Sequence, residues 1–446
     1  MIIVQTKFSN SYLAKLIAPL VVSTLLASAV GIIDTLMISG LGEASVSGVS
    51  MVNQINLLLI NIFAALATGG AVVTSQLLGA KREETAHKSA KQLIFAGLVI
   101  SLVIAAVFIV FSDEILRLCY PKLETETEKA AQTYLFITAF SYPFLAVENC
   151  CGALFRSFGK SGYCMYSSLF CNIVNIIGNA YLIYVLNIGV AGAAIATVAG
   201  RLFGMVLMLI WISGKKSPIR LNFFERFRPD AGLIRRILTI GIPSGIENGI
   251  FQLGRLLVMS IISQYSLVHT TANAVANDLD TFGCVFGASM NLAAITIIGQ
   301  CVGAHDFDGV KYYAKKLLAI EYFVGFFFYA STIVFITPIL SWYHLDGDTA
   351  ALTRTLVTMH NGIGMLIWPL AFTVPNFLRA ANDVKFTMIV SVTSMLVCRV
   401  GISYFLHTQY HLGALGVWYG MIIDWICRLS FFVVRFLRGS WKKFCM

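Results

Sequence analysis

The stretch Gln76–Arg82, QLLGAKR, returns half a chain length later as Gln300–Asp306, QCVGAHD. The same offset separates other landmarks along most of the chain: Pro19 and Pro243, Asn53 and Asn277, and the Gly-x-x-Gly motifs at 189–192 and 413–416. Arg156 and Arg379 almost keep this offset, falling a single position short of it. An internal repeat in a strongly apolar chain is typical of secondary transporters, whose two halves move about a site near the membrane midplane.

Hydrophobic residues make up 58% of the 446 positions and charged residues 12%, and the mean hydropathy is +0.79. A soluble globular domain carries roughly twice that share of charge. The apolar runs are continuous rather than alternating, which predicts membrane-spanning helices and not barrel strands. We expect twelve spans, near residues 12–40, 48–80, 90–111, 130–155, 162–186, 189–213, 234–264, 271–302, 312–338, 354–378, 384–408 and 412–436.

The net charge of +10 follows membrane topology. Lys and Arg concentrate in alternate loops, such as 81–91, 215–236 and 435–443, whereas the intervening loops hold few. This positive-inside pattern predicts a multi-pass protein of the inner cell membrane with both termini in the cytoplasm. It also leaves no reason to expect a nucleic-acid partner. Asp278 and Asp280 are expected near the outer end of their helix, in solvent.

The longest polar segment divides the chain into three parts. Residues 1–213 are expected to form a first lobe of six helices, 214–233 a cytoplasmic connector, and 234–446 a second lobe of six helices. The ten cysteines are scattered and lack the spacing of a metal site. We therefore expect neither a metal nor a cofactor.

Prolines interrupt the fourth predicted helix of each lobe, Pro143 in the first lobe and Pro369 and Pro375 in the second. A proline inside a helix frees a backbone carbonyl and permits a bend. Proline also occurs in membrane helices without such a role. Its recurrence near the same place in both lobes strengthens the interpretation as a hinge, but the ordinary interpretation stays the preferred one.

The chain contains none of the common signatures of an enzyme or an ATP-driven pump. Gly159-Lys160-Ser161 has Leu154 where a Walker A loop requires glycine. HExxH, GxSxG and Asp-rich magnesium motifs do not occur in the sequence. We therefore expect a protein that is not an enzyme and whose transport is driven by an ion gradient.

Asp34 lies in the middle of the apolar stretch Val21–Leu41. An ionised Asp at the centre of a bilayer costs at least ~2.5–3.5 kcal/mol on insertion scales. The side chain should therefore face an interior cavity or be protonated, which suits a group that binds and releases H⁺. The alternative is a structural Asp hydrogen-bonded to neighbouring Asn side chains.

Asn side chains could face Asp34 from the fifth predicted span. Asn172, Asn175 and Asn179 recur at i, i+3 and i+7, which places them on one face of a helix. Asn53 adds a polar group to the second span. A polar face within lipid needs a protein or water partner. Packing between helices is an equally open interpretation for each of these residues.

The second half has more charge inside its predicted helices, at Glu247, Arg255, Arg399, Asp424 and Arg428. Asp424 and Arg428 are four residues apart, so they can neutralise each other on one helix. Glu247 and Arg255 are roughly 12 Å apart along a helix axis, too far for a direct pair. We expect partners on neighbouring helices, with Arg399 as the obvious one for an acid. Such a network either fixes helix register or takes part in transport.

Several of these motifs together resemble the multidrug and toxic compound extrusion (MATE) family. The first set is Pro19, Asp34 fifteen residues later, the Gly40-Leu41-Gly42 turn and the exit Gln76-x-x-Gly79-Ala80-Lys81-Arg82. The second is Leu154-Phe155-Arg156-Ser157-Phe158-Gly159, then Gly241-Ile242-Pro243 with Gln300-x-x-Gly303-Ala304. The resemblance covers nearly the whole chain, and the set taken together is specific although each piece is short.

The resemblance implies twelve helices in two pseudo-symmetric six-helix lobes around a central cleft. Asp34 matches the first-helix acid that the family uses for cation coupling, and Asn175 matches the fifth-helix Asn. Asn179 stands where several bacterial members have a second Asp. Another branch has a Glu where this chain has Phe251, and 353–378 contains no acid, so the Na⁺ site of that branch cannot be transferred.

The family implies antiport of H⁺ or Na⁺ against small organic compounds, often cationic, by a monomer in the lipid bilayer. The alternatives are a lipid-linked oligosaccharide flippase of the same superfamily, a membrane-embedded transferase, and a receptor that does not transport. The missing metal-binding acid clusters speak against the transferase. The absence of a soluble signalling module speaks against the receptor.

Overall fold

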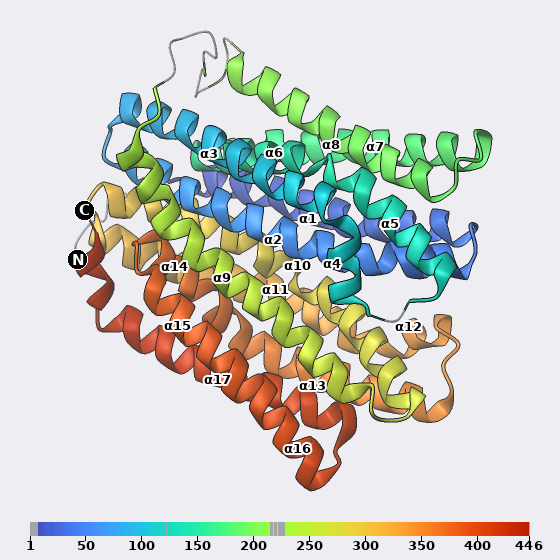
Figure 1. The fold of residues 1–446 in the computed structure, drawn as a ribbon. Coiled ribbons are helices and arrows are strands. Elements are labelled where there is room, and N and C mark those ends of the chain that lie inside the picture. The colour runs from blue at the N-terminus through green and yellow to red at the C-terminus, as the bar shows by residue number, and fades with distance from the viewer. Residues whose placement is uncertain (1–7, 122, 215–216, 218–220, 222–227, 446) are drawn as a thin grey trace. The chain divides into compact units, whose positions relative to one another are not determined.

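The computed structural model describes all residues except 1–7, 122, 215–216, 218–220, 222–227 and 446. The described part of the chain is helical, without strands (Figure 1). It divides into two compact units, Phe8–Gly245 and Ile246–Met446, called here the first and the second unit. Much of the predicted connector 214–233 lies outside the described residues.

The first unit contains α1 to α8 and the beginning of α9. Its helices are α1 (Asn10–Ser39), α2 (Glu43–Gly79), α3 (Glu83–Val110), α4 (Ser112–Cys119), α5 (Thr125–Ala139), α6 (Tyr142–Ser157), α7 (Gly162–Asn179), the π-helical η1 (Ala180–Val185) and α8 (Val190–Ser213). Helix α9 (Ala231–Ile262) passes from the first unit into the second.

The second unit continues with α10 (Leu267–Gly303), α11 (Phe307–Val334), α12 (Ile336–Trp342), α13 (Gly347–Trp368), the π-helical η2 (Pro369–Thr373), α14 (Val374–Ala380), α15 (Val384–Ser394), the π-helical η3 (Met395–Gly401), α16 (Ile402–Tyr410), α17 (Gly413–Leu437) and η4 (Ser440–Phe444). The π-helical segments continue the helices on either side of them. The unit therefore contains fewer separate long helices than labelled segments (Figure 1).

Nine helices among the described residues are long and apolar enough to cross a membrane, or ten if α5 and α6 form one bent span. Helices α9 and α17 are 32 and 25 residues long and carry ionisable side chains in apolar surroundings. With these two, a helical segment covers each of the twelve predicted spans. The prediction of an all-α, polytopic membrane protein is confirmed.

The internal repeat is visible in the lengths of the helices. Helices α2 and α10 are both 37 residues long, and α3 and α11 are both 28. The two members of each pair begin at the same offset along the chain as the repeated sequence motif. A short helix, α4 or α12, then follows in each half. The weak likeness in sequence thus corresponds to a close likeness in the helices themselves.

The Gln-x-x-Gly-Ala motif ends α2 and α10 in the same turn. The N–H of Ala80 donates to the carbonyl of Gln76 at 2.9 Å, and that of Ala304 to Gln300 at 3.1 Å. The next residue is left-handed in both copies, with φ of +57° at Lys81 and +54° at His305. This conformation closes a helix and is uncommon outside Gly and Asn. Other positive-φ residues also recur in pairs: Gly159 and Asn382, Asn187 and His411, Gly189 and Gly413.

The prolines of the fourth span mark interruptions in both halves. Helices α5 and α6 meet at a bend of 50°, and Pro143 lies in the first turn of α6. In the second half, Pro369 begins the π-helical η2 and Pro375 lies in the first turn of α14. Pro143 fits the first turn of α6 because proline has no N–H to donate there. The first copy therefore bends at its proline, whereas in the second copy Gly347–Ala380 is one span that the π-helical η2 makes irregular.

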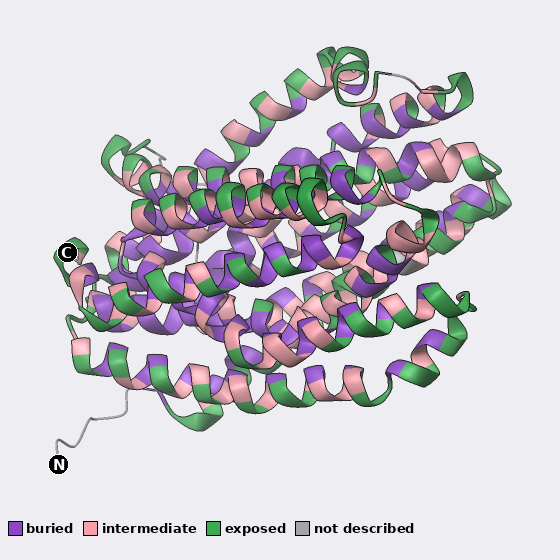
Figure 2. Cartoon of the chain, turned by 90° about the horizontal axis from the view of Figure 1, so that it is seen from below, coloured by how far each residue is buried: buried purple, intermediate pink, exposed green. Residues whose placement is uncertain are grey.

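Apolar side chains cover the outer faces of the long helices. Exposed positions recur along them in Figure 2, and they include Leu102, Val103, Leu253 and Phe323. Inside each unit small residues let helices approach closely. A Cβ on Gly48 of α2 would lie 2.8 Å from the carbonyl oxygen of Thr127 in α5. Apolar outer faces and small residues at helix contacts are the pattern expected of helices packed within lipid.

Candidate functional site

Asp34 is hydrogen-bonded to the fifth span in the first unit. The Asn179 Nδ2 atom, at the end of α7, donates to Asp34 Oδ1 of α1 at 2.7 Å. The same nitrogen donates to Asn175 Oδ1 at 3.4 Å, and Asn175 Nδ2 donates to Thr197 Oγ1 of α8 at 3.4 Å. Both Asn side chains are buried, whereas Asp34 is half-buried. One polar chain therefore joins α1, α7 and α8.

Asn179 can serve either protonation state of Asp34. Its Nδ2 donates to Asp34 Oδ1, which satisfies an ionised carboxylate. Its Oδ1 is buried and has no hydrogen-bond partner among the described residues. That oxygen could accept the hydroxyl of a protonated carboxyl after a small reorientation. The π-helical η1 begins at the very next residue, and such segments often occur at functional sites.

Arg201 of α8 is a charged residue that the analysis of the sequence missed. It lies inside the predicted span 189–213, and its Nη1 donates to Ser141 Oγ at 2.7 Å. Its positive charge acts on both Asp34 and Glu148 of α6. Glu148 Oε1 in turn accepts a hydrogen bond from Ser167 Oγ at 2.9 Å. The signal was present in the sequence, because Arg201 stands alone in an apolar run.

Asn172 and Asn53 lie outside this chain of hydrogen bonds. Asn172 Nδ2 donates to the backbone carbonyl of Leu26 in α1 at 3.3 Å. Asn53 is exposed, while Asn56 on the same helix is buried and accepts a hydrogen bond from the Tyr142 hydroxyl at 3.0 Å. Asn172 therefore ties α7 to α1 through the backbone. The polar side chain of α2 that has a buried partner is Asn56.

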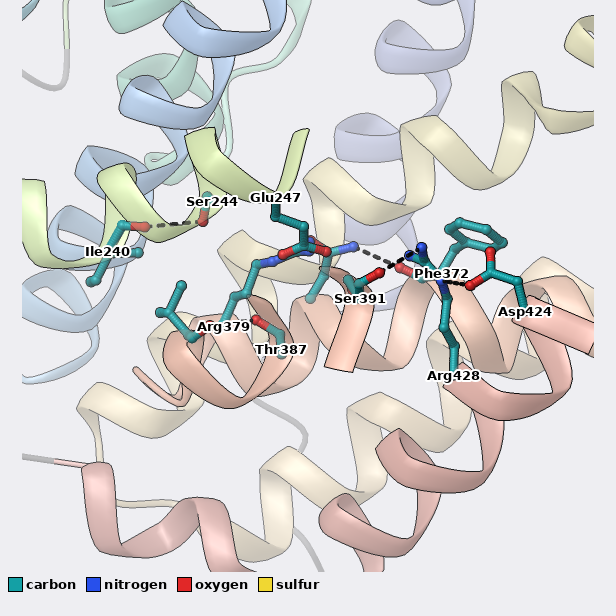
Figure 3. Close-up of polar contacts among 11 residues, drawn as sticks. Ile240, Ser244, Glu247, Phe372, Arg379, Thr387, Ser391, Asp424 and Arg428 are labelled. Carbon is teal, nitrogen blue, oxygen red and sulfur yellow. Dashed lines mark hydrogen bonds and ion pairs between the residues drawn. The ribbon is translucent and has the colours of Figure 1, made fainter. Parts of the chain in front are cut away.

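Glu247 forms an ion pair in the second unit, but its partner is Arg379 (Figure 3). The distance from Arg379 Nη2 to Glu247 Oε1 is 2.5 Å, and Arg379 Nη1 also donates to Asn376 Oδ1 at 2.7 Å. The expectation that Arg399 pairs with Glu247 is therefore wrong. In the sequence, Arg379 is a landmark of the repeat and stands just after the predicted span 354–378, among the basic loop residues. Spacing along the chain gives no information on which distant helices meet.

Asp424 and Arg428 form the pair predicted from their spacing. Arg428 Nε lies 2.8 Å from Asp424 Oδ1, and both side chains are almost fully buried. Ser394 Oγ also donates to Asp424 Oδ1, and Arg428 Nη2 donates to the carbonyl of Ser391 at 3.1 Å. Figure 3 shows this pair apart from Glu247 and Arg379, with Ser391 between them. The charges thus form two separate local pairs.

Arg399 and Arg255 have no carboxylate partner of their own among the described residues. The Arg399 guanidinium lies over the ring of Phe251, 5.4 Å from its centre, and its Nε has no hydrogen-bond partner in the described part of the chain. The Arg428 guanidinium lies 5.5 Å from the centre of the same ring. Arg255 is exposed. Phe251 therefore provides a cation–π surface. Another branch of the family that the sequence resembles has Glu at this position.

Asp280 is not solvated as expected. The distance from His360 Nδ1, in α13, to Asp280 Oδ1 in α10 is 2.7 Å. His360 is fully buried between the rings of Trp418 and Trp425, at centroid distances of 5.2 and 4.7 Å. Solvation was expected because Asp280 lies near the end of its helix. That position does not show whether a neighbouring helix supplies a partner. Asp278 is exposed, as expected.

The described residues contain no group of three or more His, Cys, Asp and Glu side chains that could hold a metal ion. The polar groups are instead single carboxylates, pairs of opposite charge, and Asn, Ser, Thr and Tyr side chains. Such groups can bind and release protons or coordinate a monovalent cation. In the first unit one carboxylate lies at the end of a series of hydrogen-bonded Asn side chains. This arrangement suits the reversible binding of a proton or a monovalent cation best.

A protein-family model described as MatE matches residues 19–182 and 243–405. The two matched ranges begin at the offset of the repeat and together cover most of the chain, so each copy of the repeat matches the family model. Each matched range begins at a landmark proline of the repeat, Pro19 or Pro243. Asp34 and Asn179 fall within the first range, and Glu247 and Arg399 within the second.

Relatives match along nearly their whole length. The uncharacterized transporter YisQ of Bacillus subtilis is 27% identical over 92% of this chain and 90% of its own. The probable multidrug resistance protein NorM of Thermotoga maritima is 23% identical over 97% and 93%. A solved structure described as an outward-facing multidrug resistance MATE family transporter of the MOP superfamily superposes with a TM-score of 0.87, at 18% identity over 97% and 96%. The fold is thus that of a known transporter structure.

Proposed function

Because this chain belongs to the MATE family of membrane transporters, we propose that it is a secondary active antiporter that exports small organic compounds, cationic and hydrophobic, in exchange for H⁺ or Na⁺. The protein would work by alternating access, in which two lobes, 1–213 and 234–446, joined by the connector 214–233, open the substrate site to one side of the membrane at a time. The names of its relatives agree with this, since NorM and MepA are described as proteins of multidrug resistance or export.

The observation that carries the proposal is the hydrogen bond from Asn179 to Asp34. Asp34 is a single carboxylate in an apolar membrane helix, and its amide partner offers a donor and an unused acceptor. A group that must alternate between a charged and a neutral form needs a partner for both forms. In the proposed cycle, Asp34 gives up its proton or cation when substrate binds and takes up another after release. Asn175 and Asn179 hold the carboxylate in place in both states.

The charge balance in the middle of the first unit favours the binding of one H⁺ or one monovalent cation. Asp34, Glu148 and Arg201 are the ionisable side chains in the middle of α1, α6 and α8. With all three ionised, the net charge of this group is −1. One proton on either carboxylate makes it zero, which removes the cost of a net charge inside the membrane. A bound monovalent cation would have the same effect, so the coupling ion is H⁺ or Na⁺.

The proposal is tested by efflux of a fluorescent cationic dye from proteoliposomes that hold the purified protein. An H⁺ gradient and an Na⁺ gradient are imposed separately, each with and without a membrane potential. We expect one of the two gradients to drive dye movement and the Asp34→Asn variant to respond to neither. Dye movement that is equally fast without any gradient would contradict secondary active transport. Movement of a lipid-linked sugar but not of the dye would favour the flippase alternative.

We further propose that both termini and the connector 214–233 lie in the cytoplasm, in the inner membrane of the cell, and that the protein is a monomer. Cys119 of α4 is exposed and belongs to the loop 112–129, which the proposed topology places outside the cell. An impermeant maleimide added to intact cells should therefore label Cys119. In a Cys119→Ser background, a cysteine placed at the exposed Arg228 should be labelled only after the cells are opened. Strong labelling at position 228 from outside would invert the proposed topology.

A further inference from the structure

Glu321 is an acid inside a membrane helix that the functions proposed above do not use. It lies in the middle of α11, only 2% exposed, within the apolar sequence Ala319–Phe328. Its Oε1 accepts from Thr373 Oγ1 at 2.9 Å. Its Oε2 is buried and has no hydrogen-bond partner among the described residues. The carboxyl group is thus almost inaccessible to solvent, and among the described residues only one of its two oxygens has a hydrogen-bond partner.

The hydrogen bonds around Thr373 fit a protonated acid. Thr373 Oγ1 lies 2.9 Å from Glu321 Oε1 and 2.8 Å from Asn291 Oδ1, but a hydroxyl has one hydrogen to give. If Glu321 carries a proton, the acid donates to Thr373 and Thr373 donates to Asn291, so both contacts are satisfied. The alternative exchanges the oxygen and nitrogen of the Asn291 side-chain amide, so that Asn291 donates to Thr373 and Thr373 donates to Glu321. In this arrangement Glu321 is an ionised carboxylate in the membrane without a cation beside it, which is costly.

A small cavity lies beside the carboxyl group. Its volume is about 10 Å³, and Glu321, Gly283, Gly287, Gly325 and Tyr329 are among the residues that line it. Space of this size holds about one water molecule when polar groups surround it. Gly325 lies one helical turn after Glu321, and a Cβ built on it meets nothing within 4 Å. The missing side chain at Gly325 therefore leaves room next to the acid.

Two tyrosines line the cavity with Glu321, and a cysteine lies between one of them and a partly exposed carboxylate. Tyr322 and Tyr329 are its neighbours on α11. The Tyr329 hydroxyl is 3.6 Å from the Cys284 sulfur of α10, and that sulfur is 3.7 Å from Asp280 Oδ1. Asp280 is paired with His360 of α13 and is 21% exposed. No Lys, Arg or His lines the cavity among the described residues, and η2 and α12 contribute no titratable side chain.

We propose that Glu321 is a second proton-binding site of this transporter, which exchanges its proton with a water in the adjacent cavity. The neutral acid, hydrogen-bonded to Thr373, would hold the π-helical η2 against α11. Loss of the proton to the cavity water would place a negative charge against Pro369–Thr373, where the helix is already irregular. The preferred conformation of this segment then depends on the protonation of Glu321.

This inference rests on the proposed function for its role in transport, but its chemistry can be tested without transport. Infrared spectra of the purified protein in nanodiscs, without substrate, report the carbonyl stretch of protonated carboxylic acids. The measurement uses an Asp34→Asn, Glu148→Gln background, which removes the two candidate acids in the membrane helices of the first unit. We expect a protonated-acid band in this background and its loss after Glu321→Gln. The exposed Glu114→Gln, in α4, is the matched control and should keep the band.

Two further variants test the hydrogen bond and the cavity next to Glu321 while the acid itself is kept. Thr373→Val removes the hydroxyl but keeps the shape, so the band should remain and shift. Gly325→Ala fills the cavity without a clash, so the band should remain while its hydrogen–deuterium exchange slows. A band that survives Glu321→Gln, or no band in the Asp34→Asn, Glu148→Gln background, overturns the proposal. A band that appears only after Na⁺ is removed would mean that a cation occupies the site, which also overturns it.

The role in transport is measured separately in proteoliposomes with wild-type Asp34. We expect Glu321→Gln to reduce gradient-driven dye efflux by roughly tenfold, within the usual range of coupling between sites. Glu114→Gln should leave it unchanged. Unchanged efflux in Glu321→Gln overturns the role in transport while the infrared result decides the proton site. If the wild type itself moves no dye under any gradient, the proposed function fails and the infrared result still stands.

Discussion

The Asp34→Asn variant is expected to fold like the wild type and to lose gradient-driven efflux altogether. Asn has the size of Asp and keeps an oxygen for the hydrogen bond from Asn179, which is 2.7 Å long in the wild type. Its Nδ2 can also donate to the buried Oδ1 of Asn179, which has no partner among the described residues. The variant therefore imitates the protonated state permanently. It cannot release a proton or cation.

The size of the effect follows from the driving force. A proton entering down a potential of ~150 mV supplies roughly 3–4 kcal/mol, enough for a concentration gradient of a few hundredfold. All of this is lost if Asp34 is the coupling group. Dye efflux and the pH profile of dye binding are measured on the purified variant beside the wild type. Binding should persist, and its dependence on pH should flatten.

The control for this experiment is Asp113→Asn, a change of the same chemistry at an exposed position of α4. It should leave efflux and binding unchanged. Full coupled efflux in a well-folded Asp34→Asn protein would end the hypothesis that Asp34 couples transport to the ion. Attention would then move to Glu148, which lies in the same unit and is also influenced by Arg201.

The largest expected loss of stability follows from Asp424→Ala. Asp424 is fully buried and Arg428 nearly so, and their atoms are 2.8 Å apart. Removing the acid leaves a buried guanidinium unpaired, which typically costs about 3–5 kcal/mol. Replacing both residues, as Asp424→Ala with Arg428→Met, removes both charges and should be much milder. The thermal unfolding of the two variants in detergent measures the difference.

The exposed Ser430→Ala on the same helix is the control and should change the unfolding temperature little. The Arg428→Met variant completes the double-mutant cycle. If the double variant is as unstable as the sum of the two single variants, the residues are not coupled, and the pair contributes nothing as a pair. The contacts of Arg428 with Phe251 and Phe372 would then explain its position better.

The fold could be predicted from the sequence because its signals are regular. Apolar runs gave the spans, and Pro19, Gln76 and Gly189 gave the repeat that the helix lengths confirm. The motif around Lys81 was recognised as a landmark, although its left-handed conformation was not foreseen. Such a turn depends on backbone geometry that residue types other than Gly seldom reveal.

The site could be predicted only where a signal lies within one helix. Asp34 was found as a lone acid in an apolar run, and Asp424 with Arg428 by their spacing. Glu321 has the same signal as Asp34, a lone acid in an apolar run, and the sequence alone could have indicated it. The pairs Glu247 with Arg379 and Asp280 with His360 join helices far apart in sequence. Chain spacing does not determine such contacts, because they depend on which helices pack together.

The π-helical segments explain how the two copies of the repeat tolerate a difference in length. Asn187 and His411 keep the offset of the repeat, whereas Gly159 and Asn382 fall a single position short of it, so the second copy has an extra residue between these landmarks. Within this stretch, η3 lies at a place in the repeat that corresponds to the regular helix α7 in the first copy. An added residue in a regular α-helix turns everything beyond it by about 100°. A wider turn absorbs the insertion locally, so single-residue insertions could reposition Arg399 during evolution while α17 keeps its register.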